Sequence, residues 1–120
     1  PTGTTQVIYE FNFQTSRLDA LAIMQYRFYI AGTEVVYARS EIAGEDISAR
    51  TNFKWVINIG GSANNNTGRL SSWTSGEELK LTAEDYGGSY DIQLHETNWW
   101  NGGGTDQFSM PQLCITAIGV

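Results

Sequence analysis

Cysteine and histidine are scarce in this 120-residue chain, and each scarcity removes a class of site. The one cysteine, Cys114, excludes an intramolecular disulfide, so a hydrophobic core must hold the fold. Cys114 lies between Leu113 and Ile115, where we expect a buried, unreactive thiol. The one histidine, His95, leaves too few ligands for a zinc site, and no cofactor is expected. Calcium in an irregular loop stays open.

The chain also lacks long apolar runs and, beyond Lys80, any basic residue. No run approaches the roughly 20 apolar residues that span a bilayer, so no transmembrane segment is predicted. After Lys80 there are five acidic residues, and the whole chain carries a net charge of −6. Nucleic acids and anionic lipids are polyanions, so they are excluded as the main partners of this acidic third.

The length fits a single domain over residues 1–120. The opening Pro1-Thr2-Gly3 leaves the location unknown. It is compatible with a cytoplasmic protein that has lost its initiator methionine, and equally with a secreted protein whose leader has been removed.

What the chain does have is apolar residues at every second position, which predicts β-strands. The alternating apolar sets are Val7, Tyr9, Phe11 and Phe13; Met24, Tyr26, Phe28 and Ile30; and Phe53, Trp55, Ile57 and Ile59. A hairpin turn at Ala31-Gly32-Thr33 leads into a further predicted strand over residues 34–39. Shorter strands are expected over 78–82, 89–95 and 113–120, and single helical turns over 16–22 and 82–87.

About seven to nine strands without βαβ alternation predict an all-β fold. We expect an antiparallel β-sandwich, jelly-roll or immunoglobulin-like, with a closed β-barrel as the alternative. Residues 81–90, LTAEDYGGSY, resemble the corner before strand F of immunoglobulin-like domains. That resemblance implies a Tyr90 side chain bonded back to the backbone and Trp55 between the sheets. The chain departs from that family by one extra residue between Asp85 and Tyr90 and by the missing cysteine pair.

Glycine is concentrated in the second half, where ten of the 13 glycines lie at position 60 or beyond. Residues 60–76 form a long polar segment with one isolated tryptophan, Trp73, and an asparagine run around Asn65. Its amides suit a polyhydroxylated ligand, and the alternative is a flexible turn with Trp73 folded onto a sheet edge. Asn65-Asn66-Thr67 is also a formal glycosylation acceptor, and its use stays open.

The segment HETNWWNGGGTD, residues 95–106, places two adjacent tryptophans directly before three glycines. Successive side chains of a strand face opposite ways, so at least one of Trp99 and Trp100 should lie outside the core. An exposed indole suits a sugar, whose ring C–H groups stack on the aromatic face. The expected polar partners are Asn98, Asn101, His95 and Asp106. The alternative is one tryptophan in the core and one at a subunit interface.

Catalysis is not expected, because a Gly-x-Ser-x-Gly nucleophile motif is missing. Glycoside hydrolysis is the enzymatic alternative, since it needs a pair of carboxylates at a set separation. The carboxylates available for it are Glu84, Asp85, Asp91 and Asp106.

The leading hypothesis is therefore a non-catalytic carbohydrate-binding protein, a lectin, whose partners are glycans. Single-site sugar affinity is typically weak, so we expect a homo-oligomer, dimer to tetramer, with an interface at Tyr29, Val35 or Tyr37. One alternative is a membrane-active or lipid-headgroup-binding β protein with Trp99 and Trp100 in the interfacial layer. The other is a structural module that binds proteins through the same aromatics.

Overall fold

The structure is a computed structural model that describes residues 1–17, 21–45, 47–74, 76–96 and 110–120. These residues form an all-β fold in which no α-helix occurs and Val36–Ala38 is a short 3₁₀ helix, η1. The described part of the chain therefore has no helix able to cross a membrane. The strands are β1 (Thr4–Arg17), β2 (Ala22–Ile30), β3 (Thr33–Glu34), β4 (Ser40–Gly44), β5 (Ser48–Asn58), β6 (Leu79–Asp85), β7 (Ile92–Leu94) and β8 (Gln112–Gly119).

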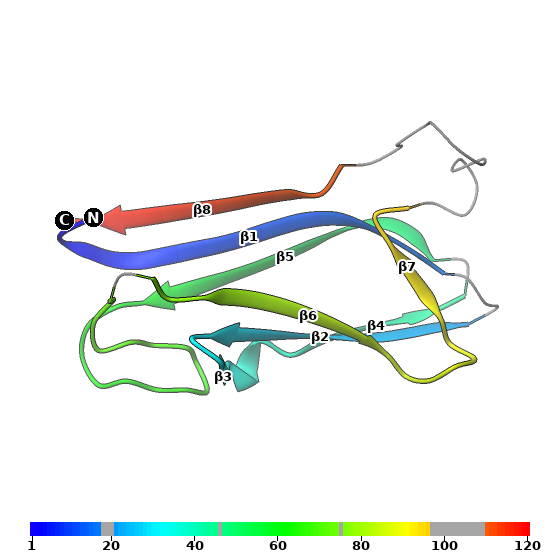
Figure 1. Ribbon diagram of the computed structural model, residues 1–120, viewed down its shortest axis with the longest axis horizontal. Helices are drawn as coiled ribbons and strands as arrows, with labels where there is room; N and C mark the ends of the chain where they lie inside the picture. Colours follow the sequence, from blue (N-terminus) through cyan, green and yellow to red (C-terminus); the bar gives the residue numbers. More distant parts are fainter. Residues whose placement is uncertain (18–20, 46, 75, 97–109) are drawn as a thin grey trace.

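The strands form two four-stranded antiparallel sheets, shown in Figure 1. In sheet A, β1 lies between β5 on one side and β7 and β8 on the other. In sheet B, β2 pairs with β3, β4 and β6. Among the described strands none pairs across from one sheet to the other, so the closed barrel is wrong.

The predicted alternation decides which side chains form the core. Tyr9 pairs with Trp55 and Phe11 with Phe53, so the inward faces of β1 and β5 match in register. Phe28 of β2 is fully buried, and its ring centroid lies 4.8 Å from that of Tyr9. The two sheets therefore share one apolar core, and burying each aromatic side chain of this kind contributes about 1.5–3 kcal/mol.

A small polar cluster is buried next to this core. Thr15 is fully buried, and its Oγ1 lies 2.7 Å from Oγ1 of Thr51 and 3.2 Å from the hydroxyl of Tyr26. Burial raises the pKa of Tyr26, and the hydrogen bonds with the two threonines oppose that shift. Because each buried hydroxyl has a partner, the cluster avoids the desolvation cost of an unpaired polar group.

Several local expectations were wrong. The strand after the hairpin ends at Glu34, and most of residues 34–39 is instead occupied by η1 and its flanks. Residues 82–85 belong to β6, so the helical turn over 82–87 is not present. Ser16 lies in β1 rather than in a helical turn. Cys114 is exposed, and Val35, expected at an interface, is 1 % exposed.

Candidate functional site: a groove beside Trp73

The loop over residues 60–73 is held by hydrogen bonds along its length. Asn64 and Arg69 exchange two backbone hydrogen bonds, of 3.0 and 3.1 Å. The Asn64 side-chain oxygen accepts from the backbone N–H of Asn66 at 3.0 Å, which is how asparagine stabilises a turn. The indole N–H of Trp55 donates to the carbonyl of Thr67 at 3.1 Å. These hydrogen bonds tie the loop to itself and to Trp55 of β5.

Gly68 lets the loop lie directly on the core. Its φ of +72° falls in the left-handed region, which favours glycine. A Cβ at this position would lie 3.0 Å from Ile30 Cδ1 and 3.0 Å from Val35 Cγ2, closer than side chains normally approach. The backbone therefore takes the place of a side chain here, and this close contact sets the position of the residues that follow.

Trp73 follows this anchored loop and lines a groove of about 620 Å³. Val7, Ile59 and Ala117 supply aliphatic walls, while Ser71 and Ser72 supply hydroxyls. Residues 1–4 complete the lining. Trp73 is half-buried and packs against the core, so part of its ring is fixed and part is available to the groove. The volume lies within the roughly 300–1,000 Å³ typical of small-ligand sites.

The side chains that line the groove are all uncharged. Hydroxyls from Thr2, Thr4, Ser71 and Ser72 stand around an aromatic and aliphatic floor. A ligand that matches these side chains has hydroxyl groups and an apolar face.

The structure describes three of the eight predicted site residues and does not bring them together. Trp73 lines the groove, whereas Asn65 lines a separate cavity of about 120 Å³ beside Gly68 and Arg69. His95 bonds through its backbone N–H to the Gln14 carbonyl at 2.8 Å, near the far end of β1. Val7 lines the groove and Gln14 bonds to His95, and these two residues of β1 lie about 23 Å apart along the strand, so His95 is far from the groove. Trp99, Trp100, Asn98, Asn101 and Asp106 lie outside the described residues.

His95 is held between aromatic rings. Its ring centroid lies 6.3 Å from Phe11 and 6.0 Å from Phe13, both in edge-on arrangements. The backbone φ of +69° places it in the left-handed region, which histidine adopts more readily than most residues. Its Nδ1 is buried and has no hydrogen-bond partner among the described residues. These contacts make it part of the packing at this end of the core.

Two of the carboxylates considered for hydrolysis lie on sheet B. Glu84 and Asp85, with Glu41, line a hollow of about 380 Å³ on β2, β4 and β6. The Glu84 carboxylate accepts a hydrogen bond of 2.6 Å from the side-chain amide of Gln25. Asp91 lies outside the hollow's lining, and Asp106 lies outside the described residues.

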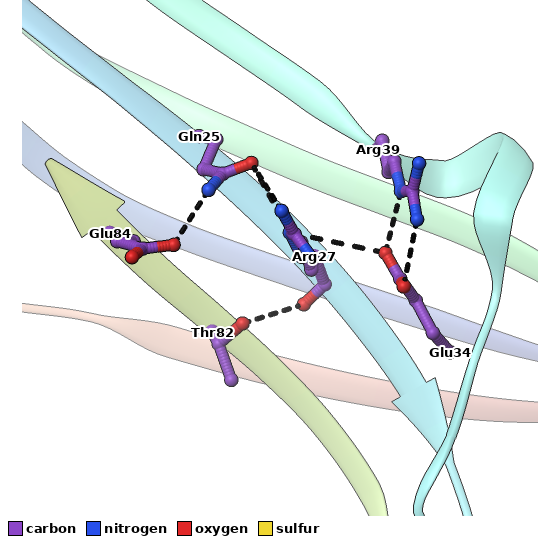
Figure 2. A network of polar contacts seen from close by, with 6 residues as sticks. All are labelled: Gln25, Arg27, Glu34, Arg39, Thr82 and Glu84. Carbon is purple, nitrogen blue, oxygen red and sulfur yellow. Dashed lines mark hydrogen bonds and ion pairs between the residues drawn. The ribbon is translucent and has the colours of Figure 1, made fainter. Parts of the chain in front are cut away.

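A ladder of polar side chains crosses the outward face of sheet B, as Figure 2 shows. Arg27 donates two hydrogen bonds to Gln25, of 3.2 and 3.1 Å, and lies 4.0 Å from Glu34. Arg39 donates two hydrogen bonds to Glu34, of 2.7 and 3.0 Å. These bonds lower the pKa of the Glu34 carboxyl and raise that of the Arg39 guanidinium. The ladder's charged groups engage one another, which favours a structural role.

Sequence reasoning missed most of the groove. Ser71 and Ser72 adjoin Trp73 in the chain, so their proximity was available as a signal. Ala117 and Val7 come together only through the register of β8 on β1, which places them opposite each other. No group of three or more potential metal ligands occurs in the described residues. No protein-family model, curated protein or solved structure matches this chain.

Proposed function

We propose that this protein is a carbohydrate-binding protein, a lectin, that holds a neutral sugar in the groove beside Trp73. The observation that carries the proposal is a half-buried indole on the wall of a 620 Å³ groove whose other side chains are small, aliphatic or hydroxylated. Sugars present the matching chemistry, because their C–H faces stack on aromatic rings and their hydroxyls pair with serine and threonine.

The groove supports binding rather than hydrolysis. Glycoside hydrolases use two carboxyl groups that flank the scissile bond, and no aspartate or glutamate lines this groove. Ser71 and Ser72 precede Trp73 on a loop anchored at Gly68, so the polar and apolar contacts are fixed relative to each other. Such preorganisation lowers the entropy cost of binding a ligand.

We further propose that the two sheets pack as a β-sandwich. The support is the core that they share, in which the rings of Tyr9, Phe28 and Phe53 contact one another from both sheets. In such a scaffold the groove lies at the end where the first residues of β1 and the last residues of β8 adjoin (Figure 1).

A glycan array with wild-type protein and a Trp73→Ala variant tests the proposal. We expect wild type to bind a set of neutral glycans, and the variant to lose at least ten-fold in signal on them. Tyr37→Ala is the matched control, because Tyr37 is an aromatic residue with 66 % exposure that lies outside the groove lining. It should bind as wild type does. Circular dichroism should show that both variants fold.

The same array separates the other hypotheses. Glycan signal that survives Trp73→Ala and disappears in the Trp99→Ala, Trp100→Ala double variant would place the site in the segment over residues 98–106 and overturn the groove. Silence on all glycans would overturn the lectin. In that case leakage of zwitterionic liposomes would support the membrane-active alternative, and release of reducing sugar from a glycan would support hydrolysis.

A further inference from the structure

Strand β8 lies at an open edge of sheet A. Among the described residues β1 is its one strand partner, and Figure 1 shows it along the outer border of the molecule. All eight residues of β8 are exposed, and the exposed fractions of Leu113, Ile115 and Ile118 are 58 %, 48 % and 41 %. An apolar strand is thus presented to solvent along its whole length.

The side chains on the inward face of β8 are left uncovered by sheet B. Leu113, Ile115 and Ala117 pair in register with Phe11, Tyr9 and Val7 of β1. Tyr9 and Val7 are buried beneath sheet B, with exposures of 5 % and 6 %. In the part of the chain that the structure describes, sheet B therefore covers β1 but ends before β8, and the inward apolar row of β8 has no counterpart there.

The hydrogen-bond pattern identifies which backbone groups of β8 face outward. The Thr5 carbonyl accepts from Ile59 beyond β5, and the Gln14 carbonyl accepts from His95 beyond β7. The backbone N–H and C=O groups of the even-numbered residues of β1 therefore point toward β8. These residues pair with residues 112, 114, 116 and 118 of β8, whose backbone groups point back toward β1. The N–H and C=O groups of residues 113, 115, 117 and 119 consequently point to the free edge.

Apart from a register shift between Thr4 and Gln6 in its pairing with β1, this edge lacks the features that normally prevent strand pairing. Edge strands in monomeric proteins are usually protected by charged residues, proline, bulges or short length. The edge strands β5 and β6 carry Lys54 and Lys80, whereas the eight residues of β8 include no charge and no proline. A strand of this composition is typical of a surface that pairs with another strand.

The uncharged β8 edge is a place where two copies of this acidic chain can meet. The chain is acidic, so two copies repel each other over most of their surfaces. Glu10, which pairs with Cys114, has its carboxylate 3.7 Å from Lys54 Nζ and bonded to Asn52 at 3.2 Å. The Glu10 carboxylate is thus paired with a cation, and the residues of β8 themselves bring no like charges together when two β8 edges approach.

We propose that β8 is a homodimer interface, in which the β8 strands of two copies pair antiparallel about a two-fold axis at Thr116. Thr116 then faces Thr116, and the large Leu113 and Ile115 face Gly119 and Ala117 of the other copy. Cross-strand threonine pairs are favourable, and large residues facing small ones fit together. A pairing centred on Ile115 would instead place Pro111, which has no N–H, opposite Gly119.

The dimer joins the two copies of sheet A into one continuous sheet. Ala117 lines the groove beside Trp73, so one groove would lie on each side of the two-fold axis. If the proposed function holds, this arrangement presents two sugar sites on one particle and increases avidity. The dimer itself rests on β8 alone and stands or falls independently of sugar binding.

Sedimentation velocity over a range of protein concentrations tests the interface with full-length chain. We expect wild type to dimerise, and Ile115→Lys to raise the dimer dissociation constant at least ten-fold, because lysine on an edge strand opposes pairing and the two introduced ammonium groups would lie near each other on one face of the joined sheet. Val56→Lys is the matched control, since it adds the same charge to a residue of sheet A with 37 % exposure. It should dimerise as wild type does. The proposal would be overturned if wild type stayed monomeric at all concentrations. It would also be overturned if Ile115→Lys and Val56→Lys weakened dimerisation equally.

A cysteine trap tests the register and does not depend on Ile115→Lys folding. In a Cys114→Ser background, Thr116→Cys should form a disulfide-linked dimer under mild oxidation, because non-hydrogen-bonded pairs have Cα atoms about 4.5 Å apart. Val56→Cys in the same background should stay monomeric. Failure of Thr116→Cys to cross-link, or faster cross-linking of wild type through Cys114, would contradict the pairing about Thr116.

Discussion

Replacing Gly68 by alanine is the sharpest test of how the groove is held in place. The alanine would have to adopt a φ of +72°, which costs an L-residue about 1–2 kcal/mol. Its Cβ would also lie 3.0 Å from Ile30 and 3.0 Å from Val35, and such overpacking costs about 1–3 kcal/mol. Alanine has less conformational entropy than glycine in the unfolded chain, which offsets about 0.4–1 kcal/mol of this destabilisation. The free energy of unfolding should therefore fall by about 1–5 kcal/mol, with about 3 kcal/mol at the centre of the range.

Gly32→Ala separates the two costs. Gly32 has a φ of +78°, but a Cβ there would meet no atom within 4 Å. This variant carries the backbone strain without the clash, so its unfolding free energy should fall by about 1 kcal/mol. Urea denaturation of both variants, with unchanged m-values, gives the difference between them. If Gly68→Ala is no less stable than Gly32→Ala, the loop is not pressed against the core and the fixed position of Trp73 has no basis.

Three further predictions concern the core and the polar clusters. Phe28→Ala removes a fully buried ring and should lower the unfolding free energy by about 3–5 kcal/mol in urea denaturation, and a loss below about 1 kcal/mol would contradict its central place. Thr15→Val deprives the Tyr26 hydroxyl of a partner at 3.2 Å and should cost about 1–3 kcal/mol, whereas a neutral result would show that the cluster relaxes. The pKa of Glu34 lies below its ordinary 4.5, so the stabilisation by its ion pair is full above about pH 5 and is lost as the pH falls through the lowered pKa. Thermal melts of wild type and Glu34→Gln should accordingly differ at neutral pH and converge as the pH falls below the lowered pKa of Glu34, and a gap that stays constant with pH would refute the assignment.

The long strands could be predicted because one pattern sets both their conformation and their burial. Val7, Tyr9 and Phe13 lie on one face of the segment, opposite Ile8, Glu10 and Asn12, and all three are buried where β1 crosses the core. The same holds for Met24, Tyr26, Phe28 and Ile30, which are the inward residues of β2. Alternation at every second residue is a local property of the chain, so it predicts which side chains face inward without knowledge of the strand order.

Positions set by tertiary contacts could not be predicted in this way. Cys114 lies in an apolar stretch, which normally indicates burial, but its pairing with Glu10 places its side chain on the outward face of sheet A, where the thiol is exposed. Residues 82–85 have a helical capping pattern, yet pairing with β2 makes them part of a strand. In both places a neighbour distant in sequence decided the outcome.

In the candidate site, too, the features set by local sequence could be predicted and those set by tertiary contacts could not. Trp73 could be selected because an isolated tryptophan in a polar loop has few roles other than contact with a ligand or the core. Asn65 could not be separated from Trp73 by sequence, because only the turn at Asn64 and the contact of Gly68 with the core direct the two residues to different cavities. The opposing wall at Val7 and Ala117 depends on the pairing of the first and last strands, which no local pattern encodes.

The measurement that most directly tests the central claim follows the indole N–H signals of nitrogen-15-labelled protein during titration with neutral sugars. The chain has four tryptophans, and the signal of Trp73 is identified by its absence from a Trp73→Phe sample. The groove predicts that the Trp73 signal shifts saturably with the sugars that bind on the array. The Trp55 signal, hydrogen-bonded to Thr67 at 3.1 Å, should stay in place. A Trp73 signal that does not move while a sugar saturates the protein would contradict sugar binding in this groove.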